Sequence, residues 1–248
     1  MKRSLFFILL LINIIPIYAR RDKNSEAGQV YVGGSLGIGI PTSIGRNSDE
    51  ISFSDVCRLG FASSINCTWM QSEAVGVGAE LVYMSNPYKE EYWINLTTNY
   101  RGSFDAEYKT MGLDAFGKLF FGKNEIRPYF GVFVGGFYVK NSLSFTSDPQ
   151  FIGTTQDASV SYEYNKIKIG FGGDLGFYYR ISSTTRLSLN VRLSLLPFLD
   201  EVNKQIKDSS ESYYTAEYTN DVVMNPHGNQ NAIVVSAGLN FGIRNKRK

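Results

Sequence analysis

The stretch Lys168–Arg180, KIGFGGDLGFYYR, decides between two folds, because its glycines suit either a phosphate-binding loop or a β-strand. A phosphate-binding loop requires glycines that end a strand and open a helix. Here apolar residues alternate straight through the glycines, and no helical pattern follows them. A strand over 167–177 places Gly170, Gly172 and Gly176 on one face with Asp174. The pattern therefore predicts a strand.

The same alternation of apolar and polar residues occurs eight times along the chain. Period two sustained over about ten residues indicates a strand, and no segment shows a comparable helical period. The expected strands cover residues 29–40, 56–69, 75–83, 111–121, 129–135, 167–177, 186–195 and 233–243. The chain therefore predicts an all-β fold with eight antiparallel strands.

The links between the expected strands alternate strictly between short and long. The short links are MQSE at 70–73, GKNE at 122–125 and ISST at 181–184. The long links, rich in Asn, Ser, Asp, Glu and Tyr, lie near residues 41–55, 85–107, 140–164 and 197–230. This rhythm is typical of an up-and-down barrel whose short turns and long loops lie at opposite ends.

The two faces of the expected strands differ in charge. The apolar faces carry almost no charge, whereas the polar faces carry many glycines and a set of acids and bases. This set comprises Arg58, Glu80, Asp114, Lys118, Lys168, Asp174, Arg186 and Arg192. A soluble, lipocalin-like barrel would carry more Lys and Glu outside and is the less favoured alternative. The pattern predicts a transmembrane β-barrel with lipid outside and a polar lumen.

Aromatic residues near the strand ends agree with this orientation. Membrane barrels carry girdles of aromatic side chains at both interfaces. The candidates are Trp69, Tyr83, Phe121, Tyr138 and Tyr179.

The first residues, MKRSLFFILLLINIIPIYA, have the basic start, apolar run and small-residue exit of a secretory signal peptide. We expect a signal peptide over 1–19, with cleavage after Ala19, and a barrel domain over 20–248. A membrane anchor is less favoured, because a helical span needs about 20 apolar residues. Lys2 and Arg3 are the only charges of the leader, so the remainder carries 23 basic and 23 acidic residues. This neutrality gives no case for nucleic acid binding.

The two cysteines, Cys57 and Cys67, lie ten residues apart on one expected strand. An extended strand of that length separates them by about 33 Å, far beyond the span of a disulfide. We expect two small apolar side chains and no intrachain bridge.

The strand count, the leader, the rhythm of links and the segment RPYFGVFVGG at 127–136 resemble the small outer-membrane β-barrels, the family of the outer membrane protein A transmembrane domain. Gly238, Phe241 and Ile243 resemble the C-terminal signal by which the barrel-assembly machinery recognises its substrates. The resemblance implies a bacterial outer-membrane location of the Gram-negative type. It also implies outer-membrane lipid and the assembly machinery as partners.

The polar-face charges are expected to pair, because an eight-stranded interior is just wide enough to be filled by side chains and unpaired buried charge is costly. Glu80, Asp114, Asp174 and Arg192 should lie at similar mid-barrel heights, with Lys118 about one layer below. We interpret the set as a structural plug and expect no large conductance. The alternative is a gated pathway, a narrow channel for ions or small solutes.

No catalytic residue, cofactor or metal site is predicted. His227 and nearby acids and serines, namely Asp200, Glu201, Asp221, Ser209, Ser210 and Ser212, could be drawn into a hydrolase set, but polar loops supply such residues by chance. Function is expected in the loops. The aromatic candidates for binding a host protein, a glycan or lipopolysaccharide are Tyr88, Tyr92, Trp93, Tyr100, Tyr213, Tyr214 and Tyr218. The sequence thus predicts a non-enzymatic surface protein with an adhesive or envelope-structural role.

Overall fold

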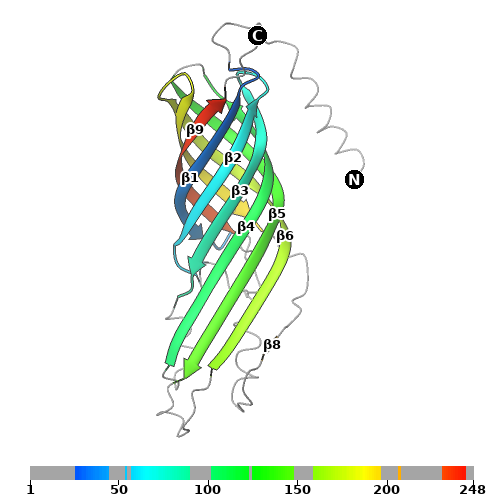
Figure 1. Ribbon diagram of the computed structural model, residues 1–248, viewed down its shortest axis with the longest axis vertical. Helices are drawn as coiled ribbons and strands as arrows, with labels where there is room; N and C mark the ends of the chain where they lie inside the picture. Colours follow the sequence, from blue (N-terminus) through cyan, green and yellow to red (C-terminus); the bar gives the residue numbers. More distant parts are fainter. Residues whose placement is uncertain are drawn as a thin grey trace, which may run out of the picture.

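The computed structural model describes residues 26–44, 54, 57–89, 102–122, 125–147, 159–196, 206–207 and 231–243. These residues form nine strands: β1 Val30–Pro41, β2 Gly60–Met70, β3 Val75–Pro87, β4 Gly102–Phe120, β5 Ile126–Ser147, β6 Ser159–Arg180, β7 Thr185–Leu195, β8 Ile206–Lys207 and β9 Ala232–Ile243. Eight of them build a closed antiparallel barrel, with β8 outside its wall (Figure 1). The predicted fold class is confirmed.

The barrel is closed by its first and last strands. β1 pairs with β9 along their whole length, from Val30 opposite Ile243 to Pro41 opposite Ala232. Because every wall strand has two neighbours, the barrel segment leaves no unpaired sheet edge. The start of β1, the end of β9 and the three short turns lie at one end, which we call the short-turn end. Among the described residues, the chain forms no helix long and apolar enough to cross a membrane, a finding that has no bearing on strands.

The glycines on the inward face make room for larger neighbours. A Cβ at Gly172 would collide with the backbone oxygen of Leu193 and lie 2.6 Å from the ring of Phe133. A Cβ at Gly131 would collide with the carboxylate of Asp174. Gly170, Gly172 and Gly176 all face the lumen, so the strand interpretation of the 167–177 segment is confirmed.

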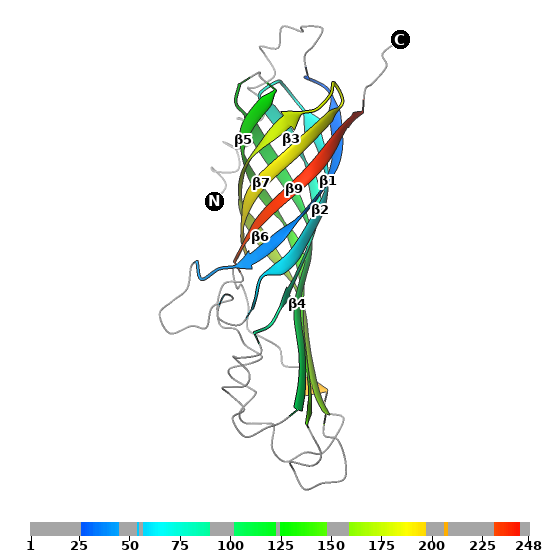
Figure 2. The same ribbon diagram turned by 90° about the vertical axis from the view of Figure 1, so that its left-hand side faces the viewer.

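Three strands continue well past the closed barrel. β4, β5 and β6 run on together as a sheet at the end opposite the short turns, as Figures 1 and 2 show. β5 and β6 stay paired as far as Thr146 opposite Ser159, whereas β3 ends at Pro87, opposite Glu107 of β4. We call residues 102–107, 141–147 and 159–164 the extension.

The extension shortens two of the expected loops. β4 begins at Gly102, inside the range expected as a loop near 85–107. β5 and β6 likewise cover both ends of the range near 140–164. β8, within the range 197–230, adds two residues to the sheet opposite Ser161 and Tyr162.

Candidate functional site

The lumen holds the charges that the strand pattern placed on the polar faces. Seven of the eight predicted side chains are buried inside the barrel: Glu80, Asp114, Lys118, Lys168, Asp174, Arg186 and Arg192. Four inward aromatic rings, Phe116, Tyr129, Phe133 and Tyr178, fill the space between them. Lys168 lies nearest the long-loop end, at the register position opposite Phe137.

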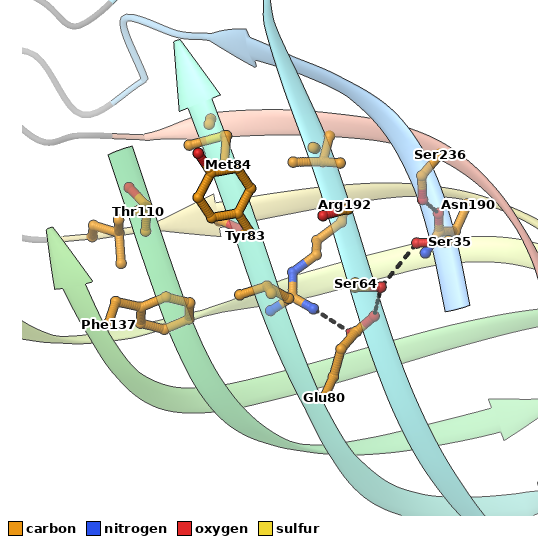
Figure 3. A pocket seen from close by; sticks show the side chains of 17 residues that line it. Ser35, Ser64, Glu80, Tyr83, Met84, Thr110, Phe137, Asn190, Arg192 and Ser236 are labelled. Atoms are coloured by element: carbon orange, nitrogen blue, oxygen red, sulfur yellow. Dashed lines mark hydrogen bonds and ion pairs between the residues drawn. The ribbon is translucent and has the colours of Figure 1, made fainter. Parts of the chain in front are cut away.

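Arg192 is the centre of the mid-barrel network. Its Nη1 donates to Glu80 Oε2 at 2.6 Å, and its Nη2 donates to Asp114 Oδ2 at 2.5 Å. The guanidinium also lies 3.5 Å from the centroid of the Phe133 ring. Ser64 Oγ donates to Glu80 Oε1 at 2.5 Å. One buried cation therefore serves two carboxylates, and Figure 3 shows its contact with Glu80.

A second ion pair lies one layer closer to the short-turn end. Lys118 Nζ contacts Asp174 Oδ2 at 3.2 Å, and it lies 4.7 Å from the ring centroids of Phe116 and Tyr129. The strand register aligns Asp174 with Arg192, as expected from their spacing. The Asp174 carboxylate nevertheless pairs with Lys118, because Arg192 is already shared between two acids.

A cavity of about 50 Å³ lies on the long-loop side of the Arg192 network. Ser35, Ser64 and Glu80 line it, together with Asn190 and Ser236 (Figure 3). A volume of this size holds a few water molecules, since one water needs about 10–15 Å³. Larger side chains, among them Met84, Phe137 and Leu196, border it towards the loops. The cavity is a small space of mixed lining within a largely filled lumen, with polar side chains towards Glu80 and apolar side chains towards the loops.

The short-turn end is closed by rings and charges. Phe120, Tyr129 and Tyr178 pack together with centroid separations of 5.3–5.6 Å. Next to them, Glu26 forms ion pairs with Arg127, Arg180 and Arg186. Sequence reasoning identified Arg186 alone of these four residues. Arg127 could have been found, because it has the same strand parity as the inward Tyr129.

The long-loop end is closed by an apolar cluster that includes Tyr108, Phe137, Val139 and Leu196. Two buried asparagines join the chain segments around it. Asn86 Nδ2 donates to the carbonyl oxygens of Gly39 and Arg58 at 3.1 and 2.9 Å. Asn231 Oδ1 accepts from Leu196 N at 3.1 Å, while its Nδ2 donates to Ile44 O.

Two predicted site residues lie elsewhere than expected. Arg58 precedes β2 and is exposed, and its backbone N donates to Pro87 O at 2.8 Å, so it is not a lumen charge. Tyr88, a proposed loop-binding residue, is buried and pairs with Cys57 in an isolated β-bridge. Arg58 lies elsewhere because the alternation breaks before β2, which begins at Gly60, and Tyr88 because β3 runs on to Pro87, past its expected end at residue 83. The two cysteines lie in different surroundings: Cys57 is buried, and Cys67 is exposed on the outer face. Both thiols are free, in agreement with the expectation of no intrachain bridge. Burial raises the pKa of the Cys57 thiol well above its ordinary value.

An exposed ion pair marks the rim where β4 leaves the barrel. Lys109 Nζ contacts Glu107 Oε2 at 2.5 Å, and Ser85 Oγ donates to Glu107 Oε1 at 2.5 Å. The hydrogen bond from Lys109 has the largest effect on the Glu107 carboxyl, and together with the bond from Ser85 it lowers the pKa of that group below its usual range.

The remaining predicted residues fall into two groups. Gly238, Phe241 and Ile243 of the expected assembly signal lie in β9, with Phe241 and Ile243 on the outer surface. The others lie outside the described part of the chain: Tyr92, Trp93, Tyr100, Asp200, Glu201, Ser209, Ser210, Ser212, Tyr213, Tyr214, Tyr218, Asp221, His227 and the leader. Among the described residues, no group of three or more His, Cys, Asp or Glu side chains could hold a metal ion.

The outer surface of the barrel is apolar. On β4, every outward residue from Phe121 to Met111 is apolar, and Lys109 follows at once. About ten residues at about 3.3 Å each, on a strand tilted by about 40°, give a band about 25 Å tall, which is the height of the lipid-facing band of outer-membrane barrels. Trp69, Phe121 and Tyr179 are exposed at its short-turn edge, and Tyr138 is exposed at the other edge. Tyr83, also at the second edge, is half-buried.

These features define the class: an eight-stranded, up-and-down transmembrane β-barrel with a filled, charged lumen. No family model matches the chain. No curated protein matches its sequence.

Several solved small barrels are similar in structure. Neisserial surface protein A is 14% identical, over 86% of this chain and 96% of that one, with a TM-score of 0.45. A major outer membrane protein from Thermus thermophilus is 14% identical, over 88% and 100%, with a TM-score of 0.45. Ail, the attachment invasion locus protein of Yersinia pestis, is 10% identical, over 87% and 99%, with a TM-score of 0.42. The sequences differ too much for any site residue to be transferred.

Proposed function

We propose that the chain is a non-enzymatic protein of a bacterial outer membrane that binds a partner outside the cell through the extension and its loops. The observation that carries this proposal is the continuation of β4, β5 and β6 far beyond the closed barrel. A barrel that only anchored the chain in lipid would need strands of about 9–11 residues. β5 and β6 have 22 residues each.

The proposed orientation follows from the ends of the barrel. In outer-membrane barrels, short turns face the periplasm and long loops face outside. The extension then projects away from the cell, together with the loops expected to carry Tyr92, Trp93 and Tyr100. The partner would be a host protein or a glycan. Outer-membrane lipid and the barrel-assembly machinery are the further partners that this location requires.

The filled lumen favours this proposal over a channel. The aromatic and arginine layer, the Lys118 and Arg192 networks and the apolar cluster around Phe137 succeed one another along the lumen. The small cavity beside Glu80 is the one feature of the described residues that favours a narrow pathway. Planar-bilayer recordings separate the two functions. Stable openings of nanosiemens conductance would support the channel, and the absence of conductance would support a closed lumen.

The test of surface binding uses a variant that removes the outer part of β5 and β6 together with the link between them. Ser142 and Glu163 are direct register partners. Replacing residues 143–162 with Asn-Gly, a dipeptide that favours a two-residue hairpin, should therefore leave the barrel intact. A matched control replaces GKNE at 122–125 in the opposite turn with another four-residue turn.

The expected result is loss of bacterial adherence to a cultured epithelial layer for the shortened variant and full adherence for the control. Both variants should keep the heat-dependent migration in SDS gels that folded barrels show, and both should fractionate with outer membranes. Unchanged adherence, or fractionation with soluble periplasmic protein, would contradict the proposal. An envelope-structural role predicts instead that the shortened variant still protects a deletion strain against detergent.

A further inference from the structure

Three arginines from three neighbouring strands converge on one carboxylate at the short-turn end. Arg127 and Arg186 are the second residues of β5 and β7, and Arg180 is the last residue of β6. Arg127 pairs with Glu26 Oε2, while Arg180 and Arg186 pair with Oε1. The side chains of Arg127 and Arg186 are 6% and 4% exposed, and that of Arg180 is 38% exposed. Arg127 and Arg186 are therefore buried, and solvent reaches the site at Arg180.

The carboxylate and the cations come from structurally different parts of the chain. Glu26 lies in a turn before β1, where Gly28 adopts a φ of +81° and Gln29 N donates to Glu26 O at 3.0 Å. Gly28 N donates to Met70 O at 2.7 Å, which ties the turn to the end of β2. The arginines, in contrast, are held by the closed wall. The cationic site thus exists independently of the turn that supplies its ligand.

Aromatic rings and backbone oxygens hold the arginines in place. Arg186 lies 3.8 Å from the ring centroid of Tyr31, and its Nη2 donates to Tyr31 Oη at 2.7 Å. Arg127 lies 5.2 Å from the ring centroid of Phe120. Arg127 Nη2 also donates to the backbone oxygen of Glu73. Such contacts orient a guanidinium without neutralising its charge.

The site has more positive charge than its ligand neutralises. Three guanidinium groups face one carboxylate, and Glu73 is the second acid beside Arg127. Arg127 Nε is buried and has no hydrogen-bond partner among the described residues. Planar guanidinium groups bind carboxylate and phosphate with paired hydrogen bonds. The site therefore has one donor that no described residue uses, beside three guanidinium groups whose charge a single carboxylate does not balance.

We propose that the short-turn mouth is an oxyanion-binding site, in which Glu26 is the built-in ligand and a free carboxylate or phosphate can take its place. Exchange would release the Glu26 side chain from the arginines while they remain neutralised, and the backbone hydrogen bond from Gly28 N to Met70 O would still hold the turn at the end of β2. The site is distinct from the extension, so its test does not depend on the proposed surface function.

The experiment is chemical rescue of a variant that lacks the carboxylate. Glu26→Ala removes the ligand and leaves the arginines, so the thermal unfolding midpoint should fall in detergent micelles. Acetate or phosphate, titrated at constant ionic strength against chloride, should raise it by about 5–10 °C at a hundredfold excess over the dissociation constant. Rescue by acetate alone would identify a carboxylate ligand, and stronger rescue by phosphate would identify a phosphate.

Glu107→Ala is the matched control, because it removes an exposed carboxylate at the opposite end of the barrel. Both it and the unmodified chain should respond much more weakly than Glu26→Ala, because in both of them Glu26 competes with the added anion for the arginines. If Glu26→Ala does not fold, the isosteric Glu26→Gln variant replaces it in the same titration. The proposal would be overturned if acetate and phosphate raised the unfolding midpoint of Glu26→Ala no more than chloride does. It would also be overturned if they raised the midpoint of Glu107→Ala by the same amount as that of Glu26→Ala.

Discussion

Along β4 and β5, the membrane-facing part of the barrel and its rim near Glu107 place opposite kinds of side chain on the same outward face. In the barrel, outward residues such as Leu113 and Val132 are exposed and apolar, while the inward Asp114 is buried and charged. At the rim, the outward residues are Lys109 and Glu107, and the inward Tyr108 and Val139 are almost completely buried. One continuous hydrogen-bond ladder crosses the reversal. The comparison teaches that the solvent outside each segment decides which residues face it: lipid in one segment and water in the other.

The largest effect is expected where charge meets charge inside the barrel. Arg192→Met leaves the Glu80 and Asp114 carboxylates buried beside each other without their cation. Removing one partner of a buried ion pair typically costs about 3–5 kcal/mol. The free energy of unfolding, measured by denaturant titration in lipid vesicles, should fall by that amount. Adding Glu80→Gln and Asp114→Asn to this variant should restore most of it. Equal stability of the single and triple variants would show that the network is not paired.

A charge placed outward on β5 tests the reversal directly. Val132 and Ser142 share one strand and one parity, but they lie on opposite sides of the rim. Val132→Arg should lower the free energy of unfolding by about 2–4 kcal/mol, the cost of an arginine at the bilayer midplane. Ser142→Arg should change it by less than about 0.5 kcal/mol, as surface substitutions usually do. Similar values for the two variants in lipid vesicles would remove the boundary that we place between them.

Glycine substitutions compare the two sides of the wall. Gly172→Ala directs a methyl group into Leu193 O and the Phe133 ring, whereas a Cβ at Gly136 meets nothing within 4 Å. Overpacking a filled interior typically costs about 1–3 kcal/mol. Gly172→Ala should therefore lower the unfolding midpoint in denaturant, and Gly136→Ala should leave it unchanged or raise it. Tolerance of both changes would mean that the lumen is less filled than the structure indicates.

The smallest effect is expected at the rim pair of Glu107 and Lys109. Exposed ion pairs contribute about 0–1 kcal/mol, so Lys109→Met should lower the free energy of unfolding by no more than that at pH 7. Because the folded pKa of Glu107 is lowered, the contribution is present above the unfolded pKa of about 4.3 and is lost as the pH falls through the folded pKa. A stability difference between the two proteins that persists at lower pH would assign the effect to packing.

Alternation in the sequence is sufficient to predict the barrel, because lipid and lumen impose opposite demands on neighbouring residues. It also identifies the lumen charges from Glu80 to Arg192. The alternation does not predict the extension. Its sequence is polar at the positions where a membrane strand would be apolar, so it resembles a loop. Residues such as Lys109 and Lys140 signal the reversal only once the rim is known.

The short-turn site could not be predicted for a different reason. Glu26 precedes β1, in a turn that belongs to no periodic pattern, so parity gives it no direction. The convergence of Arg127, Arg180 and Arg186 depends on the closure of the barrel and on the stagger of three strands. Sequence spacing alone does not specify either. The position of Arg58 was misjudged because the pattern was extended past the true start of β2.

The pairing of β1 with β9 also limits how the protein can be made. The paired residues Val30 and Ile243 are about 200 residues apart in the sequence. Forming this ladder therefore has nearly the largest entropic cost of loop closure that the chain can have. No partly synthesised chain can complete the ring, and until β9 is present the free edges of β1 and β7 carry unpaired amide groups that hydrocarbon does not tolerate. Entry into the bilayer and completion of the ring must therefore occur after synthesis of the last strand, as a single late event.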